Sequence, residues 1–201
     1  MVWLVALLLY AGFLGWYQNW RGPLTPAEVE RFMGQLEAKS LGTPAERSHI
    51  RAFLAADDGG EFHMLNLVRL HAEQVPNPVT GELQTGRQLL EGYTAPFVRA
   101  LFRRGGHPAF LGFPIGDVVD TWGVEPPPRW SLVGMMRYRS RRDMIELVVS
   151  DRFSSVHVLK HAAMPATTSF PMSRTRFMMG PRVWVALLLL LGAALVKLAL
   201  R

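Results

Sequence analysis

The feature that most constrains this chain is a pair of apolar segments, one at each end. Met1–Tyr17 and Val183–Val196 contain no charged side chain, whereas the residues between them have ordinary polarity. Hydrophobic residues make up 49% and charged residues 19% of the 201-residue chain. This balance is too apolar for a disordered protein, and it suits one folded domain with a hydrophobic segment at either end.

The N-terminal segment, residues 1–20, is predicted to be a transmembrane helix. Its apolar run just reaches the lower limit for a spanning helix. Trp16, Tyr17 and Trp20 cluster at one end, where aromatic rings favour the level of the lipid headgroups. The alternative is a cleaved signal peptide, but no basic residue precedes the run and the tryptophans are too bulky for a cleavage site. We therefore expect an uncleaved anchor.

Residues 182–200 are predicted to form a second transmembrane helix. Nearly every residue from Val183 to Leu200 is Leu, Val or Ala, without the one-sided pattern of a buried core helix. Arg182 lies at one end of the run, and Lys197 at the other can reach the interface with its long side chain. Two spans would place both chain termini on the same side of the membrane.

Basic residues beside these two segments predict the orientation. The domain side carries Arg21, Arg31, Arg174, Arg176 and Arg182, and the terminal side carries only Lys197 and Arg201. Excess basic residues stay in the cytoplasm. The soluble domain is therefore expected in the cytoplasm, with both termini outside.

Two identical Thr-Pro-Ala-Glu segments predict two helix starts within residues 21–60. Thr25 and Thr43 can cap, a proline follows at the first helical position, and a glutamate three residues after each threonine completes a capping box. A helical hairpin is expected here, as a neck between the first anchor and the main domain.

Residues 61–178 are predicted to fold as one α+β domain. Strand patterns occupy Phe62–His71, His107–Trp122, Trp130–Arg139 and Ala166–Phe177. A helical pattern occupies Gly86–Arg104, and a second one, capped by Ser140, breaks near Ser150-Asp151 and resumes from Phe153 to Ala163. Residues 73–85 are expected to form a loop, and Pro96 to kink the first of these helices or mark a later start. The order β-α-β-β-α-β is that of the ferredoxin-like motif, an antiparallel four-stranded sheet with both helices on one face.

The first strand of this domain is apolar on both faces. Phe62, Met64 and Val68 point to one side, and Leu65 and Leu67 point to the other. A sheet with two apolar faces needs a second cover besides its helices. We therefore predict a homodimer that forms through the sheet face.

Short patterns across a little over half of the chain resemble the dimeric α+β barrel superfamily. They are His63–Arg69, Gly92-Tyr93, Gly105-Gly106, Trp130, Arg137–Ser140 and Val158–Met164. Within that superfamily the chain looks most like a bacterial group of small proteins of unknown function. The resemblance implies a ferredoxin-like homodimer and, with the two anchors, a place in the bacterial inner membrane. The superfamily includes cofactor-free monooxygenases, haem enzymes and proteins with no known reaction.

Four residues are predicted to bind a ligand: Asn66, Trp130, Tyr138 and His161. Asn66 interrupts an apolar strand, so its amide either faces a cleft or satisfies a neighbouring backbone group. Trp130 and Tyr138 share strand parity and could form an aromatic wall for a flat apolar ligand, with Arg137 on the opposite face. The alternative is that both aromatic side chains pack the sheet.

His157 and His161 stand four residues apart on an expected helix and therefore share a face. Such a pair can bind a metal or haem, but the pattern offers no third ligand, and the alternative is one packed and one surface histidine. The chain has no cysteine. We predict no metal site and no cofactor.

Several other site classes are not supported by the sequence. Asp117 and Asp120 would face opposite sides of a strand, which disfavours a pair of catalytic carboxylates. The glycine pairs do not form a phosphate-binding motif. The 22 basic residues are scattered, without the basic and aromatic stripe of nucleic-acid-binding proteins, so no nucleic acid is expected as a partner.

The expected function is that of a membrane-anchored module that binds a small ligand or assists a partner. Its expected partners are membrane lipid, a second copy of the chain, and a small apolar ligand or a membrane protein. The alternative is a monooxygenase-like or haem-dependent oxidoreductase, with Asn66, Trp130, His157 or His161 in its site. No catalytic residue is assigned, so whether the protein is an enzyme stays open.

Overall fold

The computed structural model describes residues 1–123, 125, 129–173 and 180–200, and of residues 152–155 it describes only the backbone. Capping side chains determine where several of its helices begin. Thr25, Thr43 and Thr85 each accept a hydrogen bond from the backbone three residues later, and the Glu or Gln there closes a capping box. The two boxes predicted in the Thr-Pro-Ala-Glu segments are thus confirmed. The helices are α1 (Val2–Tyr17), α2 (Pro26–Ala38), α3 (Pro44–Ala55), α4 (Gly86–Arg103), α5 (Arg141–Val148), α6 (Asp151–Ala163) and α7 (Pro181–Ala199).

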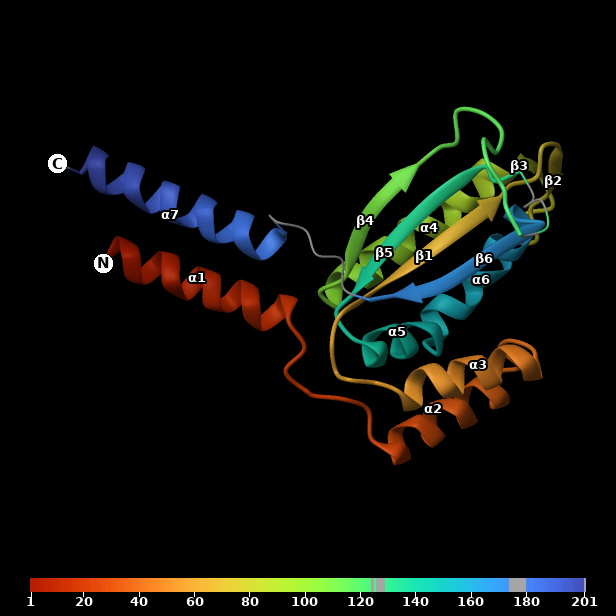
Figure 1. Ribbon diagram of the computed structural model, residues 1–201, viewed down its shortest axis with the longest axis horizontal. Coiled ribbons are helices and arrows are strands. Elements are labelled where there is room, and N and C mark those ends of the chain that lie inside the picture. The colour runs from red at the N-terminus through yellow and green to blue at the C-terminus, as the bar shows by residue number, and fades with distance from the viewer. Residues whose placement is uncertain (124, 126–128, 174–179, 201) are drawn as a thin grey trace.

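Four antiparallel strands form the main sheet, in the order β4-β5-β1-β6. They are β1 (Phe62–Arg69), β4 (His107–Gly112), β5 (Leu132–Tyr138) and β6 (Ala166–Met172). The domain is therefore α+β, and helices α4, α5 and α6 cover one face of its sheet (Figure 1). The remaining strands, β2 (Gln74–Pro76) and β3 (Leu83–Thr85), pair in a small hairpin where the sequence predicted only a loop.

The core of the domain lies between the sheet and its helices. Its fully buried side chains include Leu89 and Leu101 of α4, Ile145 and Leu147 of α5. Helix α4 begins at Gly86 and continues past Pro96, so this proline does not mark a later start. The even-numbered residues of β1 face this core, whereas its odd-numbered residues face away from it.

The α2–α3 hairpin packs into the same core as the sheet. Val29, Leu36 and Leu54 of the hairpin belong to one apolar cluster with Ile145 of α5. The hairpin runs beneath α5 and α6 on the helical side of the domain (Figure 1). It therefore extends the helical layer that covers the sheet.

Among the described residues, no helix covers the other face of the sheet (Figure 1), and this face is apolar. Leu65 at its centre lies opposite Met135 on β5 and Phe170 on β6, and Phe110 on β4 lies opposite Met135. Phe110 is 51% exposed and Phe170 is 42% exposed. We call this surface, formed by Leu65, Phe110, Met135 and Phe170, the open sheet face.

The edge strand β4 is shorter than the sequence predicted. It ends at Gly112, whereas the strand pattern extended to Trp122. The chain beyond it leaves the sheet and exposes Ile115, Val119 and Trp122 almost completely. This apolar segment lies at the end of the sheet opposite the terminal helices (Figure 1).

The two terminal helices, α1 and α7, lie side by side and project away from the domain, with both chain ends at their far end (Figure 1). The Tyr10 hydroxyl of α1 donates to the backbone carbonyl of Arg182 at 3.2 Å. Within the described ranges, α7 is the one helix long and apolar enough to cross a membrane, because the 16-residue α1 is shorter. Arg174, Arg176 and Arg201, used above to predict the orientation, lie outside the described residues.

Candidate functional site: the junction between the terminal helices and the sheet

Arg137 near the end of β5 joins the sheet to the terminal helices. Its side chain is only 2% exposed and forms an ion pair with Glu61, with the Nε atom 3.0 Å from a carboxylate oxygen. It also donates to the backbone carbonyl of Tyr17 at 3.0 Å and to that of Gly105. The guanidinium lies 3.7 Å from the centre of the Tyr17 ring, in cation–π contact.

Glu61, immediately before β1, holds two arginines together. Arg182 at the start of α7 donates to both carboxylate oxygens, at 3.1 and 2.7 Å, while Arg137 approaches from the sheet. Burial disfavours the charged carboxylate, but the hydrogen bonds and positive charges of the two arginines outweigh it and lower the Glu61 pKa to about 2. The carboxylate is therefore ionised at neutral pH and ties both terminal helices to the sheet.

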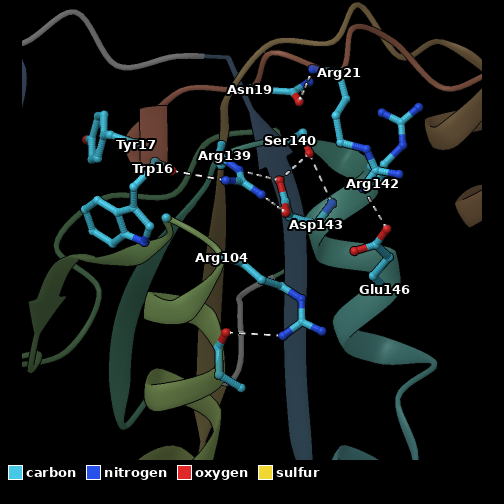
Figure 2. A network of polar contacts seen from close by, with 12 residues as sticks. Trp16, Tyr17, Asn19, Arg21, Arg104, Arg139, Ser140, Arg142, Asp143 and Glu146 are labelled. Atoms are coloured by element: carbon cyan, nitrogen blue, oxygen red, sulfur yellow. Dashed lines mark hydrogen bonds and ion pairs between the residues drawn. The ribbon is translucent and has the colours of Figure 1, made fainter. Parts of the chain in front are cut away.

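Arg139, one residue beyond β5, caps the end of α1. It donates to the backbone carbonyl of Trp16 at 3.1 Å and forms an ion pair with Asp143 of α5 (Figure 2). The Asp143 carboxylate also accepts a hydrogen bond from the Ser140 hydroxyl. The Ser140 hydroxyl oxygen in turn accepts one from the Asp143 backbone N–H and caps the start of α5. Positive charge at the C-terminal end of a helix is favourable, so Arg137 and Arg139 together stabilise the end of α1.

Arg142 fixes the segment that follows α1. It donates to the carbonyls of Gly22 and Pro23, at 3.0 and 3.1 Å, and pairs with Glu28 at 2.8 Å. The hydrogen bond from Arg142 is the largest cause that lowers the Glu28 pKa, to about 2. Nearby, Arg21 pairs with Glu146 of α5 at 3.1 Å (Figure 2).

A polar pocket of about 990 Å³ opens at this junction. Its wall combines the end of α1, the start of α7, the turn before β1 and the ends of β5 and β6. The charged side chains that line it are Asp58, Glu61, Arg137, Arg139, Arg141 and Arg182. Positive charge therefore exceeds negative charge in its lining, by four arginines to two carboxylates.

Asn66 and Tyr138, two of the predicted ligand-binding residues, lie on the helical side of the sheet. The Asn66 amide donates to the carbonyls of Met64 and Gly134, at 3.1 and 3.4 Å, and accepts from Ser169 at 2.7 Å. Tyr138 is buried and stacks on the Phe62 ring, with centroids 5.2 Å apart. Burial raises the pKa of the Tyr138 hydroxyl. Tyr138 therefore packs the core, as the alternative interpretation held.

Trp130 and His161 lie apart from these two residues. Trp130 precedes β5, so strand parity does not align it with Tyr138, and β5 itself separates them by about 20 Å at the rise of a strand. His161 is exposed on α6. The structure therefore distributes the four predicted residues along the sheet and over α6, and does not gather them around one cavity.

The histidine pair on α6 keeps the spacing that the sequence predicted. The rings of His157 and His161 are 6.1 Å apart and nearly perpendicular, and His157 lies 6.0 Å from Tyr93 of α4. Burial, with the charge of Lys160 and the neighbouring His161, lowers the His157 pKa to about 4. Among the described residues no cluster of three or more His, Asp or Glu side chains could hold a metal ion.

The residues of the junction were missed by the sequence analysis as a site. The arginines from Arg137 to Arg142 are close together in the sequence, but nothing in their spacing indicates a site. Tyr17 and Gly105 lie 120 and 32 positions from Arg137 in the chain, so local spacing could not reveal them as its partners.

Comparison with known proteins shows the fold of the domain and no family. No family model matches the chain. No curated protein matches it either. A crystal structure of RPA0582, a protein of unknown function from Rhodopseudomonas palustris, is similar with a TM-score of 0.53 and 20% identity, covering 68% of this chain and 96% of that one. The methylated form of RPA0582 gives a TM-score of 0.54 and 22% identity, covering 67% and 93%.

Proposed function

We propose that this protein is a membrane-anchored binding or accessory module whose sheet domain is held in a fixed pose at the membrane surface. The observation that carries the proposal is the junction itself. Buried ion pairs and carbonyl contacts of Arg137, Glu61 and Arg182 join two exposed apolar helices to the sheet. A flexible linker would suffice if the helices served only to retain the domain.

Exposed apolar side chains support insertion of α1 and α7 into a membrane, and α7 is also long enough to span it. Leu4 and Leu8 on α1, and Leu188 and Leu191 on α7, are each about 60% exposed, which is unfavourable in water. The 16 residues of α1 correspond to about 24 Å of helix, less than the roughly 30 Å of a hydrocarbon core. Its interfacial aromatic end would complete the crossing, with the domain in the cytoplasm of a bacterial cell and the helices in its inner membrane.

The open sheet face supports a homodimer of the dimeric α+β barrel type, with ferredoxin-like halves. A second copy would cover Leu65, Met135 and Phe170, which no helix of the same chain covers. The segment beyond β4 adds the exposed apolar side chains of Val119 and Trp122, which would contact the second copy.

Two measurements test the proposal. After carbonate extraction of cell membranes the full chain should remain in the pellet, because a peripheral protein would be released and an inserted helix would not. Light scattering of the detergent-solubilised protein should give the mass of two copies. Release by carbonate would exclude the anchor, and a monomer at micromolar concentration would exclude pairing through the sheet.

The alternative, a monooxygenase-like or haem-dependent oxidoreductase, has one supporting observation. The half-buried imidazole of His157, with its pKa near 4, is neutral at physiological pH beside Tyr93 and belongs to the helical layer that Asn66 faces. A neutral imidazole can accept a proton or bind haem iron, and Asn66 can anchor a substrate but cannot accept a proton. A Soret band in the purified protein that is lost in His157→Ala or His161→Ala would favour the haem enzyme.

A further inference from the structure

The pocket at the junction lies where lipid headgroups would lie if the helices are inserted as proposed above. Trp16 and Tyr17 at the end of α1, and Trp184 in the first turn of α7, are aromatic side chains of the kind found at that level. Arg182 and Asn19, which line the pocket, are within three residues of these positions. The pocket therefore opens beside the helices at the boundary between membrane and domain.

Three arginines present partly exposed guanidinium groups to this pocket. The side chains of Arg139, Arg141 and Arg182 are 20%, 17% and 24% exposed. Each is already oriented by a fixed partner: Asp143 for Arg139, the Phe53 carbonyl for Arg141 and Glu61 for Arg182. A guanidinium carries five N–H donors in a plane, and arginines held in place lose little freedom when they bind a phosphate.

The lining of the pocket has fewer acidic than basic side chains, and the carboxylates that pair with Arg139 and Arg141, those of Asp143 and Asp57, are buried behind it at 5% and 1% exposure. The Glu61 carboxylate is enclosed between Arg137 and Arg182, so its charge is neutralised locally. Asp58 is exposed at the rim, where its carboxylate accepts a hydrogen bond from the backbone of Gly60 at 2.9 Å. Asp58 is thus the one acidic lining residue that a bound anion would meet without an arginine paired to it among the described contacts.

We propose that this pocket binds a phosphate group, and that its ligand is the headgroup of an anionic membrane phospholipid. Arg139, Arg141 and Arg182 would donate to the phosphate oxygens from the side of the domain. The acyl chains would lie along the exposed apolar surface of α1 and α7, which begins at the same place. This proposal rests on the proposed membrane anchoring, and it identifies a ligand of the module.

A titration of the full chain in a nonionic detergent distinguishes the sources of the phosphate. The probes are dihexanoylphosphatidylglycerol, dihexanoylphosphatidylcholine and inorganic phosphate, and calorimetry measures the affinity for each. We expect the anionic lipid to bind more tightly than the zwitterionic lipid and than inorganic phosphate. Equal affinity for inorganic phosphate would overturn the lipid headgroup as the ligand, and equal affinity for the two lipids would overturn anion recognition.

Two variants with opposite expected effects test the pocket itself. Arg141→Gln should bind the anionic lipid about fivefold more weakly, the factor expected for one basic residue near an anionic surface. Asp57, its ion-pair partner, keeps hydrogen bonds from the backbones of Leu24 and Gly59, so the fold should survive. Asp58→Asn should bind about fivefold more tightly, because it removes a repelling charge while its side-chain oxygen can still accept from Gly60.

The matched control is Arg87→Gln. Arg87 is an arginine in the first turn of α4, at the opposite end of the sheet, whose ion pair with Glu91 at 3.1 Å is exposed to solvent. Its affinity for the lipid should equal that of the natural chain. Misfolding cannot explain tighter binding, so tighter binding by Asp58→Asn would support the pocket. An unchanged or weakened affinity of Asp58→Asn for the anionic lipid would overturn it. Carbonate extraction reports on the anchor separately, because this titration does not require a membrane.

Discussion

At the scale of single residues, Glu61 joins Arg137 of the sheet to Arg182 of α7 at the junction. In Glu61→Gln, Arg137 keeps its buried position but loses the carboxylate that neutralises it. Breaking a buried ion pair from one side costs about 3–5 kcal/mol. The unfolding free energy of the detergent-solubilised protein should fall by that amount. Glu91→Gln, which breaks an exposed pair with Arg87, should change it by less than about 1 kcal/mol, and equal losses would contradict this assignment.

The acid sensitivity of the protein should also depend on Glu61. Its pKa is about 2 in the folded state and about 4.5 in the unfolded chain, so the unfolded state binds more protons between these values. The stabilising contribution is therefore complete above about pH 4.5 and is lost as the pH falls toward 2. It amounts to about 3 kcal/mol at 1.4 kcal/mol per pKa unit. The unfolding free energy, measured by denaturation at pH 5 and at pH 3, should differ less between the two pH values in Glu61→Gln than in the natural chain.

At the scale of elements, the open sheet face is the surface most open to test. Met135→Glu places a charge at its centre, opposite Leu65 and Phe110, and would bury that charge between two copies. Light scattering should then give a monomer with an unchanged circular dichroism spectrum. The control is Val158→Glu, an apolar position 44% exposed on α6, which should remain dimeric. A dimer in both variants would place the interface elsewhere.

The elements with strong local signals were predictable from the sequence. The start of α2 follows from Thr25, Pro26 and Glu28 alone, because a capping box is completed within four residues. The main strands appear in the predicted order, since their patterns depend on neighbouring residues. The sequence placed the end of β4 at Trp122, ten residues beyond its observed end at Gly112. Val118 and Val119 are apolar enough for a strand, but among the described residues they have no partner strand.

The candidate site could not be predicted in the same way. Asn66 satisfies backbone carbonyls and Ser169, which only the strand register reveals. Tyr138 is buried because Phe62 pairs with it from 76 residues away. The junction pocket depends on contacts of Arg137 and Arg182 with segments that are distant in sequence, and no spacing rule connects these segments.

At the scale of the whole molecule, the orientation that we propose for the chain in a membrane can be tested with one reporter. An alkaline phosphatase fused after Arg201 should be active, because the basic flanks predict that the termini lie outside the cytoplasm. A fusion within the β2–β3 hairpin, at the exposed Val79, should be inactive. Activity only in the hairpin fusion would reverse the predicted orientation.

The arginine caps at the end of α1 also have a mechanical consequence. Because Arg137 and Arg139 hydrogen-bond its last carbonyls and Arg182 fixes the start of α7, we expect the helix pair to be joined rigidly to the sheet. If α1 and α7 are inserted in a bilayer as we propose, any tilt of the helix pair is passed on to β5. Two such molecules in one membrane would then share the same height and inclination. To bring their sheets face to face they would need only to move laterally and rotate about the membrane normal.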